Sequence, residues 1–231
     1  MHIQSEPKIL LFDIDGTLLS ADGAGRRALE LAFREVTGAD GVLANIDFRG
    51  MTDGLIVEQA LAQLSRDNSE ASFIYERYLQ HLERELGLST GTQALPGAAE
   101  LLNALAPHRH SLAIGLGTGN IEPAAYLKLN RVGLAAHFSF GGFGSDHRLR
   151  SEILRTAAQR GGKALGRDPL ECDTIVIGDT FHDVDAALAI GARAVCVATS
   201  GRTVEELKAR GAQYAFENLA APQVLQVLTG Q

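Results

Sequence analysis

One stretch near the start of the chain decides its fold, and it reads Ile9-Leu10-Leu11-Phe12-Asp13-Ile14-Asp15-Gly16-Thr17-Leu18. Its four leading apolar residues show no polar alternation, which is typical of a strand covered on both faces in a parallel sheet. Parallel sheets place ligands beyond the carboxyl ends of their strands. We therefore expect Asp13 and Asp15 to lie at a binding edge, although Asp-Gly alone also suits an ordinary turn.

Beyond residue 90, apolar strand-like runs alternate with segments of helical periodicity. Such alternation is typical of an α/β protein whose doubly wound, Rossmann-like parallel sheet has right-handed crossovers. The pattern predicts the first strand over 8–13, later strands over 111–116, 138–140, 174–177, 194–198 and 214–216, and helices over 95–106, 122–131, 151–160, 184–190 and 203–209.

Residues 20–89 have a different character, because their apolar positions recur only at helical intervals, over 25–37, 52–65 and 69–86. Flexible stretches at 22–23 and 89–92 flank these helices and suit hinges. We therefore predict a catalytic core domain made of residues 1–19 and 90–231. A helical cap domain, residues 20–89, is predicted to be inserted into it.

Composition limits the classes of partner. A formal net charge of -7 disfavours nucleic acid and anionic membrane surfaces, both of which would repel the chain. Neither a signal-peptide core nor an apolar run long enough for a membrane span is present in the sequence, so a cytoplasmic location is expected. Cys172 and Cys196 form no metal-binding or redox pair and are predicted to be reduced core thiols.

A second candidate site follows the strand at 111–116, in the string Gly117-Thr118-Gly119-Asn120. Backbone amides at the start of the next helix can hold a phosphate, and Thr118 adds a hydroxyl donor. A plain strand-to-helix turn is the alternative. Dinucleotide binding is less well supported, because the third glycine of that fingerprint is missing.

A third candidate site, Ile177-Gly178-Asp179-Thr180-Phe181-His182-Asp183, repeats the design of the first, with an apolar strand that ends in glycine and spaced acids. Magnesium prefers oxygen ligands and commonly uses one or two carboxylates together with substrate phosphate. Asp179 is the better direct ligand. Asp183 is expected to orient a metal-bound water or a neighbouring basic group, and helix capping by both acids is the alternative.

Basic residues gather before the helix at 151–160, in Asp146-His147-Arg148-Leu149-Arg150. Arginine stays charged at working pH, and its planar fork matches phosphate. Arg150 and Arg148 are both candidates for phosphate binding. A solvated helix-start arginine remains the alternative reading, and His147 is expected to be a supporting or surface residue.

Taken in chain order, these stretches resemble the four motifs of the haloacid dehalogenase superfamily of phosphotransferases. The resemblance implies a nucleophile at Asp13 and a general acid-base at Asp15. It also implies phosphate binding by Thr118, Gly119, Asn120 and Arg150, magnesium binding by Asp13, Asp15 and Asp179, and a supporting role for Asp183. The chain departs from the pattern in motif three, where Arg150 stands in place of the usual lysine, so the resemblance favours Arg150 and leaves Arg148 as the second choice.

Members of this superfamily carry a cap between motifs one and two, and residues 20–89 are similar to it. In such caps a loop reads the leaving group, which points here to residues 48–53, with Arg49 and Thr52 as specificity residues. An exposed loop arginine is the alternative for Arg49.

The resemblance implies a magnesium-dependent phosphatase that acts on a small phosphorylated metabolite, most like phosphoglycolate phosphatase, as a monomer or homodimer. A phosphomutase of the beta-phosphoglucomutase type would share the core motifs. A non-catalytic phospho-acceptor, like a response-regulator receiver, is a third hypothesis, against which the long insertion and Asp15 both argue.

Overall fold

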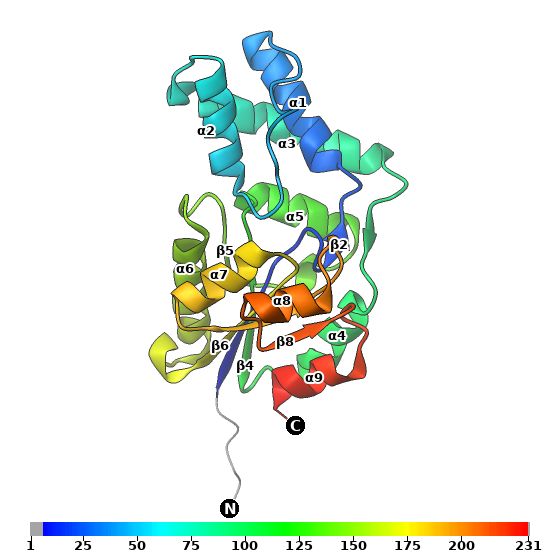
Figure 1. Ribbon diagram of the computed structural model, residues 1–231, viewed down its shortest axis with the longest axis vertical. Coiled ribbons are helices and arrows are strands. Elements are labelled where there is room, and N and C mark those ends of the chain that lie inside the picture. Colours follow the sequence, from blue (N-terminus) through cyan, green and yellow to red (C-terminus); the bar gives the residue numbers. More distant parts are fainter. Residues whose placement is uncertain (1–6, 231) are drawn as a thin grey trace, which may run out of the picture.

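The computed structural model of the chain describes residues 7–230 and shows a six-stranded parallel sheet with helices on both faces (Figure 1). Phe12, at the end of the first strand, lies opposite Leu116 on one side and Ile177 on the other. The predicted doubly wound α/β fold is therefore confirmed. The strands follow one another in the order β5 (Gly141–Gly142), β4 (Leu112–Gly117), β1 (Lys8–Phe12), β6 (Asp173–Gly178), β7 (Arg193–Val197) and β8 (Tyr214–Phe216).

The residues of β1 alternate between two apolar layers. Ile9 and Leu11 pack with α6 (Arg150–Leu165), α7 (Phe181–Ala189) and α8 (Val204–Arg210). Leu10 and Phe12 face the layer that contains α4 (Ala98–Leu105), α5 (Glu122–Arg131) and α9 (Pro222–Thr229). Because both faces are covered, all five residues of β1 are buried, as its unbroken apolar run predicts.

Three further helices stand beyond one end of the sheet: α1 (Ala24–Thr37), α2 (Asp53–Gln63) and α3 (Ala71–Leu88) (Figure 1). α1 packs along α3. The chain leaves the core through β2 (Leu19–Ser20) and returns through β3 (Gln93–Ala94), and these two strands pair antiparallel. The helices agree with the periodicity of this segment, whereas its status as a separate cap domain stays a prediction.

Several elements differ from the sequence prediction. The edge strand β5 lies just after the predicted stretch 138–140. Its Gly142 fits the close approach of α6, since a Cβ there would lie 2.1 Å from the Ile153 carbonyl oxygen. The two-residue strands β2 and β3 were not predicted, because such short elements carry little periodicity. The helix α9 was also missed, although it has eight residues.

The two cysteines are both free thiols, but only Cys196 belongs to the core. Cys172 lies just before the central strand β6, where it is only partly buried and packs against the border of the core, so the prediction of a second buried core thiol is wrong. Within residues 7–230, none of the helices combines the length and the apolar character that crossing a membrane requires.

The layered core predicts that the loss of stability on replacing a leucine by alanine depends strongly on how deeply that leucine is buried. Leu11→Ala should lower the free energy of unfolding by about 2 to 5 kcal/mol, because Leu11 is fully buried in the central strand. Leu170→Ala is the matched control, since Leu170 is 92% exposed and should change stability by less than about 0.5 kcal/mol. Urea unfolding monitored by circular dichroism measures both values, and equal losses would contradict the assigned core.

Candidate active site

Three neighbouring strands deliver polar residues to one edge of the sheet. Asp13 follows β1, Thr118 follows β4 and Asp179 follows β6. All three line a cavity of about 640 Å³, which the helical segment 20–89 covers through residues of α1, α2, α3 and the loop before α2. The carboxyl edge of the sheet is therefore the candidate site, as the sequence predicts.

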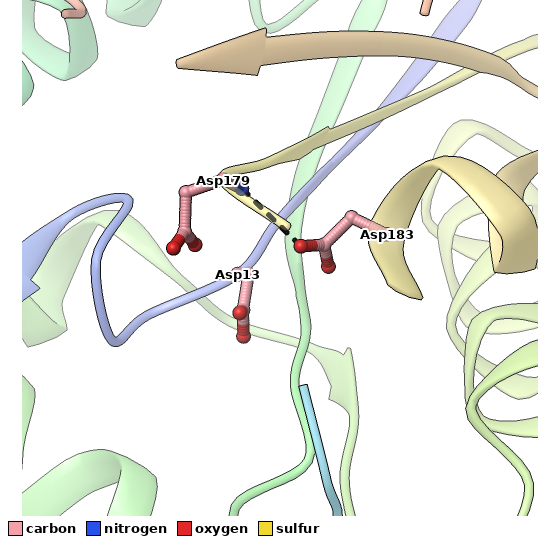
Figure 2. Close-up of side chains that lie close together, drawn as sticks. All are labelled: Asp13, Asp179 and Asp183. Atoms are coloured by element: carbon pink, nitrogen blue, oxygen red, sulfur yellow. Dashed lines mark hydrogen bonds between the residues drawn. The ribbon is translucent and has the colours of Figure 1, made fainter. Parts of the chain in front are cut away.

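Asp13, Asp179 and Asp183 form a buried acid cluster, in which one carboxylate oxygen from each residue lies within 4.8 Å of the others (Figure 2). Burial raises the pKa of Asp13 to about 6, against the lowering effect of Arg150, and the charge of Asp183 adds to the rise. Burial, together with the charges of Asp183 and Asp13, also raises the pKa of Asp179 well above its ordinary value. So much crowded negative charge, carried on hard oxygen ligands, fits a bound divalent cation.

The carboxylate of Asp183 is already fully engaged by its neighbours. Its Oδ2 accepts hydrogen bonds from the backbone amides of Asp179 and Thr180 at 3.2 and 3.0 Å and from the Thr180 hydroxyl at 2.8 Å, and its Oδ1 accepts from Arg150. Glycine is needed at 178, because a Cβ there would lie 2.2 Å from the Asp183 Cγ. Asp183 therefore holds the loop after β6 in place, and Asp13 and Asp179 keep oxygens for a cation.

Arg150, the first residue of α6, links two members of the acid cluster. Its Nη2 lies 2.8 Å from Asp13 Oδ2 and 2.5 Å from Asp183 Oδ1, and its side chain is only 9% exposed. Burial alone would lower the pKa of Arg150, but the two carboxylates outweigh burial and raise it. Arg148, by contrast, is exposed and pairs with Glu58 of α2, while His147 is exposed.

The turn after β4 is fixed by hydrogen bonds among side chains. The buried Thr118 hydroxyl oxygen accepts from Asn120 Nδ2 at 2.9 Å, which leaves its own proton for the cavity. Asn120 Nδ2 also donates to Asp15 Oδ2 at 2.8 Å, and Asn120 Oδ1 accepts from Lys128 Nζ at 2.6 Å. Asn120 therefore ties the loop after β1 to helix α5.

Asp15 does not belong to the acid cluster. Its Oδ2 accepts from Lys128 Nζ at 2.6 Å, so this carboxylate has a cationic partner of its own. Asp13 and Asp15 thus have different basic partners, although the charge of Asp15 contributes to the raised pKa of Asp13. The predicted contribution of Asp15 to metal binding remains a prediction.

Sequence reasoning did not identify Lys128 as a site residue, and it included Asp53 only as the last residue of the predicted loop 48–53. Lys128 is 5% exposed and lies on the same face of α5 as Ala124 and Ala125, so the available signal was a lysine on an apolar helical stripe. Asp53 begins α2, and its Oδ2 accepts from the Ile121 amide at 2.9 Å, at the start of α5. No local pattern reveals a helix cap supplied by a residue 68 positions away.

The two predicted specificity residues have different surroundings. Arg49 lines the cavity, but it is exposed and its guanidinium pairs with Asp47 at 2.7 Å. Thr52 is buried and caps α2, accepting from the Leu55 amide at 3.2 Å, and is not among the lining residues. A role in specificity stays a prediction for both.

Gly119 lets the helical segment approach the core closely. A Cβ there would lie 2.4 Å from the Met51 carbonyl oxygen, and the Gly119 carbonyl accepts from the Asp53 amide at 2.8 Å. The close contact with Met51 therefore requires a glycine at position 119. Phosphate binding by Gly119 stays a prediction.

Comparisons with known proteins agree with this geometry. The chain matches a family model described as "Hydrolase: haloacid dehalogenase-like hydrolase" over residues 7–191. A search of curated proteins found no match.

Similar solved structures share the fold along nearly the whole chain. A hydrolase from Pseudomonas syringae is 23% identical with a TM-score of 0.66, covering 93% of this chain and 94% of that chain. CbbY from Rhodobacter sphaeroides in complex with phosphate is 16% identical with a TM-score of 0.70, covering 93% and 95%. A predicted phosphoglycolate phosphatase from Haemophilus somnus 129pt is 17% identical with a TM-score of 0.68, covering 97% and 99%.

The acid cluster predicts opposite effects of one substitution with and without a cation. Without metal, Asp179→Asn should raise the melting temperature by about 2 to 4 °C, because it removes about 1 kcal/mol or more of repulsion among buried carboxylates. With magnesium chloride, wild type should gain stability and the variant should not. Differential scanning fluorimetry measures both shifts.

Asp185→Asn is the control for this experiment, because Asp185 is half-exposed and pairs with Arg210 outside the cluster. It should keep the wild-type response to magnesium. If Asp179→Asn responds to magnesium as wild type does, the cation does not bind at this cluster.

Proposed function

This chain belongs to the haloacid dehalogenase-like hydrolase family, and from that premise we propose that it is a magnesium-dependent phosphatase acting on a small phosphorylated metabolite. One observation carries the proposal. The Asp13 carboxylate lies at the floor of a closed-over cavity, 2.8 Å from the Arg150 guanidinium and within the acid cluster of Asp179 and Asp183. This arrangement supports the proposal, because a carboxylate that could act as nucleophile, a fixed positive charge and oxygens that could bind a cation lie together.

The main task in phosphate monoester hydrolysis is to stabilise charge on the phosphoryl oxygens, because that charge repels an attacking carboxylate. Arg150, the Thr118 hydroxyl and the amides of the turn at 118–120 would hold these oxygens. Asp13 would attack phosphorus through its free oxygen and form an aspartyl-phosphate, which divides one hard displacement into two easier ones. Asp13 and Asp179 would hold magnesium, which supplies positive charge at the phosphoryl group.

Asp15 is the proposed general acid-base. Lys128 and Asn120 hold its side chain by hydrogen bonds at 2.6 and 2.8 Å, and Asp15 lines the same cavity as Asp13. It would give a proton to the leaving alcohol in the first step and take one from water in the second. The fixed position separates proton transfer from the attack by Asp13.

The two neighbouring arginines provide a direct test of the phosphate site. Arg150→Ala should lower kcat/KM for an aryl phosphate by about 10²-fold or more, because it removes a buried donor aimed at the phosphoryl oxygens. Arg148→Ala is the matched control, since Arg148 only pairs with Glu58 at the surface, and it should stay within about threefold of wild type. Equal losses in steady-state assays would move the phosphate-binding role away from Arg150.

The division of labour between Asp13 and Asp15 gives a second test. Asp15→Asn should slow the hydrolysis of the phosphoenzyme by about 10² to 10⁴-fold, because water attack needs the base, whereas an aryl leaving group needs little acid. The variant should therefore accumulate a phosphoryl group on Asp13. Rapid quench with an aryl phosphate, tryptic digestion and mass spectrometry should detect it on the peptide of residues 9–26. Asp13→Asn should show no adduct, and an adduct that maps elsewhere would refute the assignment.

A further inference from the structure

The cavity that contains Asp13 is also lined by Tyr78, from α3, which is 2% exposed. Within residues 7–230, the buried side-chain atoms that lack a hydrogen-bond partner do not include the Tyr78 hydroxyl, and no side chain or backbone group bonds to it. The hydroxyl is therefore accessible from the cavity, where a ligand oxygen can become its hydrogen-bond partner.

The ammonium group of Lys128 borders the same space. It donates to Asp15 and Asn120 at 2.6 Å each, and an ammonium has a third N–H to give. The Lys128 Nζ and the Tyr78 Oη lie 3.6 and 3.7 Å from the point where a Cβ on Gly25 would stand. Both donors are therefore within van der Waals contact of the same point beside Gly25, which brings them close to each other.

Asp53 adds an acceptor to this corner. Its Oδ2 is occupied by the Ile121 amide, while its Oδ1 has no partner in the part of the chain that the structure describes. Its bond to the Ile121 amide holds it against the start of α5, the helix that carries Lys128. A tyrosine hydroxyl, an ammonium and a carboxylate thus line the same cavity.

The charges on this side of the cavity cancel. Arg49 is paired with Asp47, and Arg26 donates to two backbone carbonyls and stacks on the ring of Phe48. Without a surplus of positive charge, a second acidic group on the substrate would not be attracted. Apart from the acid cluster and Arg150, the charged lining residues are Asp15, Asp22 and Asp53 against Arg26, Arg49 and Lys128.

We propose that Tyr78, Lys128 and Asp53 form a leaving-group subsite that binds a hydroxyl of an uncharged, hydroxylated alcohol, such as a polyol or sugar phosphate. A hydroxyl both accepts and donates, so it can accept from Tyr78 and Lys128 and donate to Asp53. A carboxylate could only accept, and it would face Asp53. The inference rests on the proposed phosphatase function and narrows its substrate away from phosphoglycolate-like acids.

The test compares esters that differ only in the alcohol. Wild type should hydrolyse glycerol 1-phosphate or ribose 5-phosphate with at least about tenfold higher kcat/KM than propyl phosphate, because a site built to bind a hydroxyl rejects the analogue that lacks it. The hydroxylated esters should also exceed 2-phosphoglycolate. Tyr78→Phe removes one hydroxyl and should lower the preference for the hydroxylated ester over propyl phosphate by about three- to tenfold.

Tyr75→Phe is the matched control, because Tyr75 lies on the same helix but is not among the residues that line the cavity. It should keep the wild-type preference. An unchanged preference in Tyr78→Phe, or a wild-type preference for 2-phosphoglycolate, overturns the subsite while hydrolysis of an aryl phosphate still supports the phosphatase. Failure of wild type to hydrolyse any ester, the aryl phosphate included, overturns the phosphatase and the subsite with it.

Discussion

The contact between Arg150 and two buried carboxylates is the constraint on which the site depends. Asp13 follows β1, Asp179 follows β6 and Asp183 lies in the first turn of α7, and the three carboxylates cluster. Like charges that are buried together cost free energy unless a positive charge compensates them. Arg150 supplies one positive charge to Asp13 and Asp183. Burial first, and the neighbouring carboxylates second, raise the pKa of Asp13 and Asp179 even though Arg150 is present. A bound divalent cation would stabilise the ionised form of both carboxylates.

The fold explains why these charges meet. Asp13 and Asp179 end adjacent parallel strands, Thr118 ends the strand on the other side of β1, and Arg150 begins the helix that covers one face of the sheet. Each residue sits at a point that a sequence pattern can locate, namely the end of an apolar run or the start of a helix. This is why these positions, and the α/β fold itself, could be predicted from the sequence.

The other half of the cavity could not be predicted in the same way. Lys128 and Tyr78 occupy regular positions on helical stripes, where a sequence shows only periodicity. Asp53 reads as an ordinary acid in the first turn of a helix, and its cap on α5 exists only in the folded protein. Contacts between segments far apart in the chain leave no pattern in the local sequence. The residues of the proposed leaving-group subsite are therefore harder to predict from the sequence than those of the proposed phosphate site.

Helix α5 connects the two halves of the site. Its start supports the turn that contains Thr118, and Lys128 follows six residues after Glu122, about 9 Å further along the axis. A buried ammonium needs compensation for its charge, which Asp15 provides, and Asp15 and Asn120 accept hydrogen bonds from two of its three N–H groups. The carboxylate that stabilises Lys128 is therefore also the proposed proton donor. Because a helix is rigid over this distance, α5 fixes the position of Lys128 relative to the turn that contains Thr118.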